Sequence, residues 1–357
     1  MVLGPKRHNN LVPRPSQRSR WPLAVGLAAG VALDALFGDP RRGHPVAAFG
    51  RAAAALEARD YADSRRRGAA HTAACVLAVA APAVLVHRRT RGRPPWQVAA
   101  AATAVWAVIG ARSLHHEAER AWLSLHRHDL SAARDVLPSL CGRDPAALDA
   151  AEITRAVIES VAENTSDAVV APLLWGAVAG IPGLVAYRAV NTLDAMVGHR
   201  SARYLRFGWA SARLDDVANW IPARVTAALT AACAPLVTRT SPVKVVQVVL
   251  RDGGGHPSPN AGRCEAAFAA ALGVRLGGTN VYDGVAEARP ELGGLGRASE
   301  PEDIRRAIFL SRAVTVSATA LAVLVVLSAD GRSYRRRCMK KPTTQTTSAM
   351  MATHHSR

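Results

Sequence analysis

The stretch A-V-V-A-P-L-L-W-G-A-V-A-G-I-P-G-L-V-A-Y, residues 168–187, decides the class of fold. It carries no charged side chain and is as long as a bilayer core requires, about 20 residues. Four residues that interrupt helices lie inside it: Gly176, Gly180, Pro182 and Gly183. Broken helices at membrane depth tend to line sites. We therefore expect a membrane-embedded segment that is broken, and it is our candidate for a re-entrant one.

Five further apolar runs accompany this stretch: Trp21–Phe37, Ala73–Val86, Trp96–Ala111, Val225–Val237 and Ala313–Ala329. The last is just long enough to span a bilayer, and the others need flanking residues to do so. Their Ala, Leu and Val content is typical of helices. Apolar and polar residues do not alternate with the period of two that a β-strand would show. The predicted fold class is all-α, a polytopic integral membrane protein. It has about five or six apolar helices, one of them a re-entrant candidate, joined by polar helical loops.

Charge and composition support this class and exclude others. Of the 357 residues, 45 are Lys or Arg and 27 are Asp or Glu, which gives a net charge of +18. The 49% of hydrophobic residues excludes a chain that is disordered throughout. Five cysteines without a C-x-x-C pair exclude a disulfide scaffold. The arginines flank apolar runs instead of alternating with aromatics, so we expect a multi-pass protein of the cell membrane and no nucleic-acid partner.

Three regions follow from these patterns. Residues 1–20 form a basic, disordered extension, residues 21–330 a single membrane-embedded domain, and residues 331–357 a basic, low-complexity tail. Arginines near both ends place both termini in the cytoplasm. Six complete spans would put the polar motifs on alternating faces of the membrane, so at least one run is expected to be re-entrant or buried. Between the apolar runs, Asp144-Pro145 predicts the start of a polar helix.

The first polar cluster holds Asp34, Asp39 and His44. Asp34 lies within an apolar run, where a carboxylate costs about 2.5–3.5 kcal/mol, so it requires a partner. Asp39 and His44 are equally consistent with an ordinary turn and loop.

The second cluster lies directly before the long apolar stretch and contains Glu159, Glu163, Asn164 and Asp167. The two glutamates are four residues apart on one helix face, where like charges repel, and a cation between them would remove that penalty. A solvated helix end with capping residues is the alternative.

The third cluster follows the stretch. Asn191 and Asp194 are three residues apart, as are Asp216 and Asn219, and Asp215 is next to the second pair. Hard oxygen ligands presented in this way suit Mg²⁺ together with a substrate phosphate. Four arginines between the pairs are able to neutralise phosphate: Arg200, Arg203, Arg206 and Arg213. A juxtamembrane helix with ordinary salt bridges remains the alternative.

The fourth cluster is a glycine-rich loop, residues 251–262, that precedes a helical run over 263–272. It contains Arg251, His256, Ser258 and Asn260. Free N–H groups and the helix dipole make such a helix N-terminus an anion site. A Walker P-loop is absent, as are the dinucleotide-binding, zinc-protease and serine-hydrolase motifs.

Together these residues resemble the adenosylcobinamide-phosphate synthase family of cobalamin biosynthesis (CobD/CbiB). The resemblance is carried by G-D-P at 38–40, E-S-V-A-E-N-T-S-D at 159–167, N-T-L-D-A-M-V-G at 191–198 and S-P-N-A-G at 258–262. It runs in order from about residue 22 to residue 328. His199 departs from it, because an aromatic residue, usually tyrosine, is expected there.

The resemblance implies a membrane ligase that joins adenosylcobyric acid to (R)-1-aminopropan-2-ol, or its O-phosphate, by forming an amide. The product is adenosylcobinamide or its phosphate. Amide formation needs an activated carboxyl group, most simply an acyl phosphate from ATP. Mg²⁺ and ATP are therefore the expected cofactors, and the corrinoid is a substrate. Membrane lipid and other late enzymes of the cobalamin pathway are the expected partners.

We predict that the four clusters converge on one metal and phosphate site at the membrane surface. The predicted catalytic residues are Glu159, Glu163, Asp194, Asp216 and His256. The predicted substrate or phosphate ligands are Asp34, Asp39, His44, Asn164, Arg213, Asn219, Arg251, Ser258 and Asn260. The predicted metal ligands are Asp167, Asn191, Asp194, Asp215 and Asp216. Two alternatives stay open: a membrane prenyltransferase that uses Mg²⁺-diphosphate substrates, and a non-catalytic scaffold for corrin-pathway enzymes.

Overall fold

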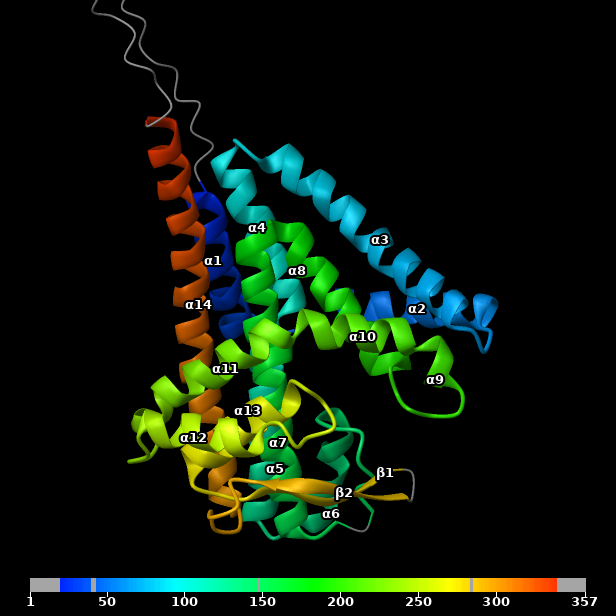
Figure 1. The fold of residues 1–357 in the computed structure, drawn as a ribbon, viewed down its shortest axis with the longest axis vertical. Helices are drawn as coiled ribbons and strands as arrows, with labels where there is room; N and C mark the ends of the chain where they lie inside the picture. Colours follow the sequence, from blue (N-terminus) through cyan, green and yellow to red (C-terminus); the bar gives the residue numbers. More distant parts are fainter. Residues whose placement is uncertain (1–19, 40–42, 147, 283–284, 339–357) are drawn as a thin grey trace, which may run out of the picture.

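The structure is a computed structural model that describes residues 20–39, 43–146, 148–282 and 285–338. Helices dominate the described chain, with one two-stranded antiparallel hairpin beside them (Figure 1). The helices before the long apolar stretch are α1 (Trp21–Phe37), α2 (Pro45–Asp60), α3 (Arg65–Thr90), α4 (Pro94–Val108), α5 (Ala111–His126), α6 (Leu130–Val136) and α7 (Ala150–Thr165). The π-helical turn η2 (Ser166–Val170) leads into α8 (Ala171–Val197), α9 (Tyr204–Phe207), α10 (Trp209–Ala218) and α11 (Trp220–Cys233). The remaining elements are α12 (Pro242–Asp252), α13 (Ala261–Leu272), β1 (Leu276–Tyr282), β2 (Val285–Leu292) and α14 (Pro301–Cys338), with short 3₁₀ turns at Leu137–Ser139 and Ala234–Leu236.

The apolar helices gather in one half of the molecule. Four helical segments of the described chain are long and apolar enough to cross a membrane, and α1 is a shorter apolar helix. Figure 1 shows α1, α3, α4, α8 and the upper part of α14 together at one end. Two glycines of α1 allow close packing on α4, since a Cβ at Gly26 would lie 2.5 Å from Ala101 Cβ and one at Gly30 would overlap Val105. The predicted class, an all-α polytopic membrane protein, is confirmed.

The long apolar stretch is broken as its sequence predicts. Gly180 has φ 70° and ψ −158°, a conformation open to glycine and not to residues with a Cβ. The chain reverses there, because the hydroxyl of Tyr187 donates to the carbonyl oxygen of Asp167 at 3.2 Å. A continuous helix would separate these residues by about 30 Å. The segment 166–197 is therefore a helical hairpin whose two ends lie at the same level.

The other half of the molecule is polar and contains α7, α12, α13 and the β-hairpin. The helix predicted to start at Asp144-Pro145 begins instead at Ala150. Asp149 caps it, because its side chain accepts from the N–H of Glu152 while the Glu152 side chain accepts from the N–H of Asp149. The β-hairpin was not predicted from the sequence. Arg155 of α7 donates to the carbonyl oxygen of Thr279 in β1 at 2.9 Å, which fastens the hairpin to this helix.

Two other expectations differ from the structure. The run Val225–Val237 forms α11 and a 3₁₀ turn, and it is not among the segments able to span a membrane. Figure 1 shows α11 lying across the bundle instead of along it. The helix α14 continues to Cys338, beyond the expected domain boundary at residue 330. Residues 1–19 and 339–357, predicted to be disordered, lie outside the described residues. The start of α1 and the end of α14 lie at the same end of the bundle (Figure 1).

Candidate functional site

The base of the hairpin holds a network of amides and carboxylates. The reversal at α8 brings Asp167 next to Asn191, whose amide nitrogen lies 3.3 Å from the Asp167 Oδ2 atom. The same amide lies 3.3 Å from Oδ1 of Asp215, which α10 supplies. Asn219 donates to Oδ2 of Asp215 at 3.0 Å, and its own oxygen accepts from Tyr187 at 2.8 Å. Direct side-chain contacts thus join the second and third predicted clusters.

Further carboxylates surround this network. Asp167 is within electrostatic range of Glu163, Asp194 and Asp215. Burial raises the pKa of Asp215, and hydrogen bonds from Asn219 and Asn191 oppose that shift. Burial also raises the pKa of Asp216, against the nearby positive charges of Arg213 and Arg200. Glu163 is exposed to solvent although it lies close to these groups. The base of the hairpin therefore concentrates negative charge where a substrate cation or a metal ion would neutralise it.

The first cluster reaches the network through Arg188. This guanidinium donates to the Asn191 oxygen at 3.2 Å and is within electrostatic range of both Asp167 and Asp39. His44 lies 3.4 Å from Asp39 and caps α2 by accepting from the Val46 N–H. Asp34 is separate. Its Oδ2 accepts from the backbone N–H of Arg112 at 3.1 Å, while its buried Oδ1 finds no hydrogen-bond partner in the described parts of the chain.

The fourth cluster docks on the third. Asn260 donates from its side chain to the carbonyl oxygen of Asp216 at 2.8 Å. The hydroxyl of Ser258 accepts from the N–H groups of Asn260 and Ala261 at 3.3 and 3.2 Å. These N–H groups at the start of α13 are therefore occupied by Ser258. Arg251 lies apart and forms a two-pronged ion pair with Asp252, whose Oδ2 also accepts from the Gly293 N–H.

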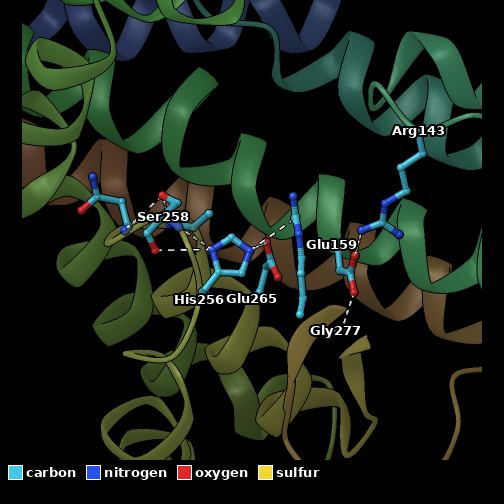
Figure 2. A network of polar contacts seen from close by, with 9 residues as sticks. Arg143, Glu159, His256, Ser258, Glu265 and Gly277 are labelled. Atoms are coloured by element: carbon cyan, nitrogen blue, oxygen red, sulfur yellow. Dashed lines mark hydrogen bonds and ion pairs between the residues drawn. The ribbon is translucent and has the colours of Figure 1, made fainter. Parts of the chain in front are cut away.

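A buried pair connects the glycine-rich loop to α13. Figure 2 shows His256 between Ser258 and Glu265. The His256 Nδ1 atom accepts from the Ser258 N–H at 3.0 Å, and its Nε2 atom lies 3.7 Å from the Glu265 carboxylate. Burial raises the pKa of Glu265, and the charges of Glu159 and Glu163 raise it further. The side chains of His256 and Glu265 are each 5% exposed, so the pair is placed to position the loop against α13.

Glu159 is held on two sides (Figure 2). It forms a buried ion pair with Arg143, and its Oε1 accepts from the backbone N–H of Gly277 at 2.6 Å. Burying an ion pair is favourable only when hydrogen bonds satisfy its remaining atoms, as the Gly277 contact does here. Glu159 thus ties the loop before α7 and the strand β1 to one point of α7. Its predicted catalytic role stays a prediction.

An arginine-rich cavity adjoins the network at Asp216. Its volume is about 580 Å³. Its basic lining residues are Arg65, His199, Arg200, Arg206 and Arg213. Trp209 and Tyr204 supply aromatic surface. Arg203, the remaining arginine of the predicted set, is instead engaged with Glu57 at 3.0 Å and lies over the ring of Tyr61. A cavity with these groups is suited to binding a polyanion beside the carboxylates.

The predicted metal ligands do not form a protein cage. Within the described ranges, no group of three or more His, Cys, Asp or Glu side chains is arranged to hold a metal ion. Asp167 and Asp215 nevertheless contact the same amide group of Asn191. Two carboxylates completed by substrate phosphate are the usual surroundings of Mg²⁺. Asp167 and Asp215 are therefore the residues whose chemistry and position fit Mg²⁺ that arrives with a phosphate.

Some side chains differ from what the sequence indicated. Asn164 folds back onto its own helix, donating to the Ser160 carbonyl oxygen at 3.0 Å. Tyr187 and Arg188 were missed, although both directly precede the Asn191 motif. Their roles depend on the reversal at Gly180, which brings them over Asp167. No role was predicted for Glu265.

Fold and site together define a polytopic helical membrane protein with a carboxylate-rich site at the base of a broken helix. A model of the CobD/Cbib protein family matches residues 27–311. A cobalamin biosynthesis protein CobD of Mycobacterium tuberculosis is 54% identical over 314 residues, which cover 88% of this chain and 97% of that protein. Its namesake in Geobacter metallireducens is 48% identical over 277 residues, 76% of this chain and 86% of that protein. A cobalamin biosynthesis protein CobD of Rhodobacter capsulatus is 38% identical over 312 residues, which cover 85% of this chain and 98% of that protein.

The chain therefore belongs to the CobD/CbiB family, as its motifs predicted. Relatives in this family carry the name cobalamin biosynthesis protein. No solved structure matches the chain.

Proposed function

We propose that this protein is an amide-forming ligase of cobalamin biosynthesis in the cell membrane. It joins adenosylcobyric acid to (R)-1-aminopropan-2-ol or its O-phosphate and gives adenosylcobinamide or its phosphate. Family membership supports the pathway. The single observation that supports the chemistry is the position of the arginine-lined cavity directly beside the carboxylate network, with Asp216 lining that cavity.

The reaction needs an activated acid, and we propose ATP as the activator. A carboxylate oxygen of the corrinoid attacks the terminal phosphorus of ATP, and ADP leaves. The amine nitrogen then attacks the acyl carbon, inorganic phosphate leaves, and the nitrogen loses a proton to a base. Arg65, Arg200 and Arg213 are placed to bind the phosphates in the cavity of about 580 Å³. Mg²⁺ bound by Asp167 and Asp215 would supply charge neutralisation for those phosphates.

Glu163 is the proposed base for the amine proton. It is exposed to solvent, in contrast to Glu159, which is 4% exposed and already paired. General base catalysis of this kind is worth roughly 10²–10⁴-fold in rate. Arg289 is within electrostatic range of both Glu163 and Glu265. We propose that Arg289, held by the buried His256–Glu265 pair, fixes the position of the Glu163 carboxylate.

The test is a coupling assay with membranes that contain the full chain. Adenosylcobyric acid, ATP and Mg²⁺ are supplied with aminopropanol in one arm and aminopropanol phosphate in another, and the corrin product is identified by mass spectrometry. A third arm contains a labelled prenyl diphosphate and aromatic acceptors. Chain-dependent coupling in the first two arms supports the proposal and identifies the amine. Prenyl transfer without coupling would favour the prenyltransferase, and no turnover in any arm would favour the scaffold.

A further inference from the structure

A small cavity lies at the tip of the α8 hairpin, far from the carboxylate network. Its volume is about 110 Å³. Its polar lining residues are Arg20, His87, Arg91 and Gln97, and residues 177–180 of the hairpin complete it with Leu23. No aspartate or glutamate lines it. The arm of the hairpin from residue 168 to residue 179 separates this cavity from Asp167 by about 18 Å.

Two side chains at this cavity, Gln97 and His87, have polar groups that make no hydrogen bond within the described part of the chain. Gln97 is 5% exposed, and in the described part of the chain its side-chain amide makes no hydrogen bond. The Nδ1 atom of His87 is buried and also lacks a hydrogen-bond partner there. The guanidinium of Arg91 forms no ion pair with any described residue. A buried polar atom without a partner, as the His87 Nδ1 atom is, costs free energy, commonly about 1–3 kcal/mol, so a ligand that satisfies it would be favoured.

The electrostatics of the cavity select for an anion. Arg20 and Arg91 are both within electrostatic range of the His87 ring. The lining contains no acidic group that would neutralise the charge of Arg91 from within the cavity. Roughly seven water-sized spheres would fill it, which is room for a phosphate-sized group. Guanidinium and phosphate form short, charge-assisted hydrogen bonds, the strongest of the common polar contacts.

The position of the cavity indicates where such an anion would come from. Trp21 and Trp96 flank it in sequence, next to Arg20 and Gln97, and their side chains are 45% and 67% exposed. Tryptophan is enriched at the level of the lipid headgroups. The last turn of α3 and the turn before α4 add three more arginines at this end of the apolar bundle: Arg88, Arg89 and Arg93. The cavity thus opens at the end of the bundle where a membrane surface would lie.

We propose that this cavity binds a phosphate group, and that its ligand is the phosphodiester of an anionic phospholipid. The phosphate oxygens accept from Arg91, from the Gln97 amide and from the His87 ring. The lipid holds the tip of the hairpin against α3 and α4 and so fixes the end of the segment whose base carries the carboxylates. The binding itself does not depend on the reaction that the protein catalyses.

The test is a thermal-unfolding titration of the purified full-length protein after lipid removal. Short-chain phosphatidylglycerol, phosphatidylcholine and inorganic phosphate are titrated separately. Two variants change the cavity, Arg91→Gln and Gln97→Leu, and Arg93→Gln is a matched control because Arg93 is exposed on the same turn and does not line it. We expect Arg91→Gln to weaken phosphatidylglycerol binding about tenfold, as for the loss of one charge-assisted hydrogen bond. Arg93→Gln should change it less than about twofold, as for an exposed charge.

Gln97→Leu gives a second readout. Removing an amide that makes no hydrogen bond within the described chain should reduce the rise in melting temperature that the lipid causes, without lowering the melting temperature of the lipid-free protein. Stabilisation by phosphatidylglycerol that both cavity variants reduce supports the lipid site. Equal stabilisation by inorganic phosphate, reduced by the same variants, supports the phosphate site and overturns the lipid as its ligand. Identical titrations for Arg91→Gln and Arg93→Gln would overturn the whole proposal.

Discussion

The reversal at Gly180 is the feature on which the proposed site depends, and Gly180→Ala tests it. Gly180 has φ 70° and ψ −158°, and a non-glycine residue in such a conformation costs about 1–3 kcal/mol. The added Cβ would also lie 2.7 Å from Cε1 of His87, an overlap that typically costs another 1–3 kcal/mol. The total of about 2–6 kcal/mol predicts a fall in melting temperature of roughly 4 °C or more.

Gly180→Ala should also disrupt the carboxylate network and lower the coupling activity. If the hairpin opens, Asn191 moves away from Asp167, and the carboxylate network loses the amide that joins it. We therefore expect coupling of adenosylcobyric acid to the amine to fall with the melting temperature, both measured on the purified protein. Gly142→Ala is the matched control, because a Cβ there meets no atom within 4 Å and its φ is not positive.

A double variant separates the backbone cost of Gly180→Ala from the cost of its overlap with His87. In a His87→Ala background the overlap is absent, so Gly180→Ala should cost only the backbone part, about 1–3 kcal/mol less than in the wild type. Unfolding is followed by thermal denaturation of all four proteins. If Gly180→Ala has the same melting temperature and product yield as Gly142→Ala, the reversal at Gly180 does not hold the site together.

Three further predictions concern the polar half of the molecule. Glu159→Gln leaves Arg143 without its buried partner and should lower the free energy of unfolding by about 3–5 kcal/mol, measured by thermal denaturation; an unchanged melting temperature would contradict this role. The hydrogen bonds of Arg251 lower the pKa of Asp252 below its ordinary 3.8, so the ionised carboxylate stabilises the fold. This stability is present above pH 3.8 and is lost as the pH falls through the lowered pKa. The advantage in stability over Asp252→Asn should therefore shrink as the pH falls below 3.8, and a constant difference would refute it. Asp216→Asn should reduce coupling roughly 10–100-fold without a fall in melting temperature, and unchanged turnover would count against a phosphate site at that residue.

Local patterns in the sequence predicted the membrane helices and their break. The glycines and proline of residues 176–183 indicated the break in the long apolar stretch, because these residue types act on their own backbone. The start of α7 was misplaced for a related reason. Asp144-Pro145 has the local pattern of a helix start, but the reciprocal hydrogen bonds of Asp149 and Glu152 place the start later. A competing cap five residues further along outweighed the proline.

Contacts between segments that are far apart in the sequence could not be predicted from local sequence patterns. The β-hairpin depends on Arg155 and Glu159, which bind β1 across more than 100 residues of sequence. Glycines in β1 also weaken the strand pattern that would have indicated it. Each of the four polar clusters was recognised from the sequence, but the sequence did not predict which clusters contact one another in the fold. Tyr187 and Arg188 acquired their contacts with Asn219 and Asn191 only because α8 reverses.

In the proposed function, the carboxylates at the base of the hairpin carry out the amide coupling. The measurement that tests it most directly is the coupling rate of Glu163→Gln and Asp215→Asn, each shown to be folded by its melting temperature. Glu302→Gln is the control, since this exposed glutamate contacts only Trp122 and His126 among its described neighbours. We predict that Glu163→Gln loses roughly 10²–10⁴-fold in rate and that the control keeps its activity. Wild-type rates in both site variants would show that the coupling, if it occurs, takes place elsewhere.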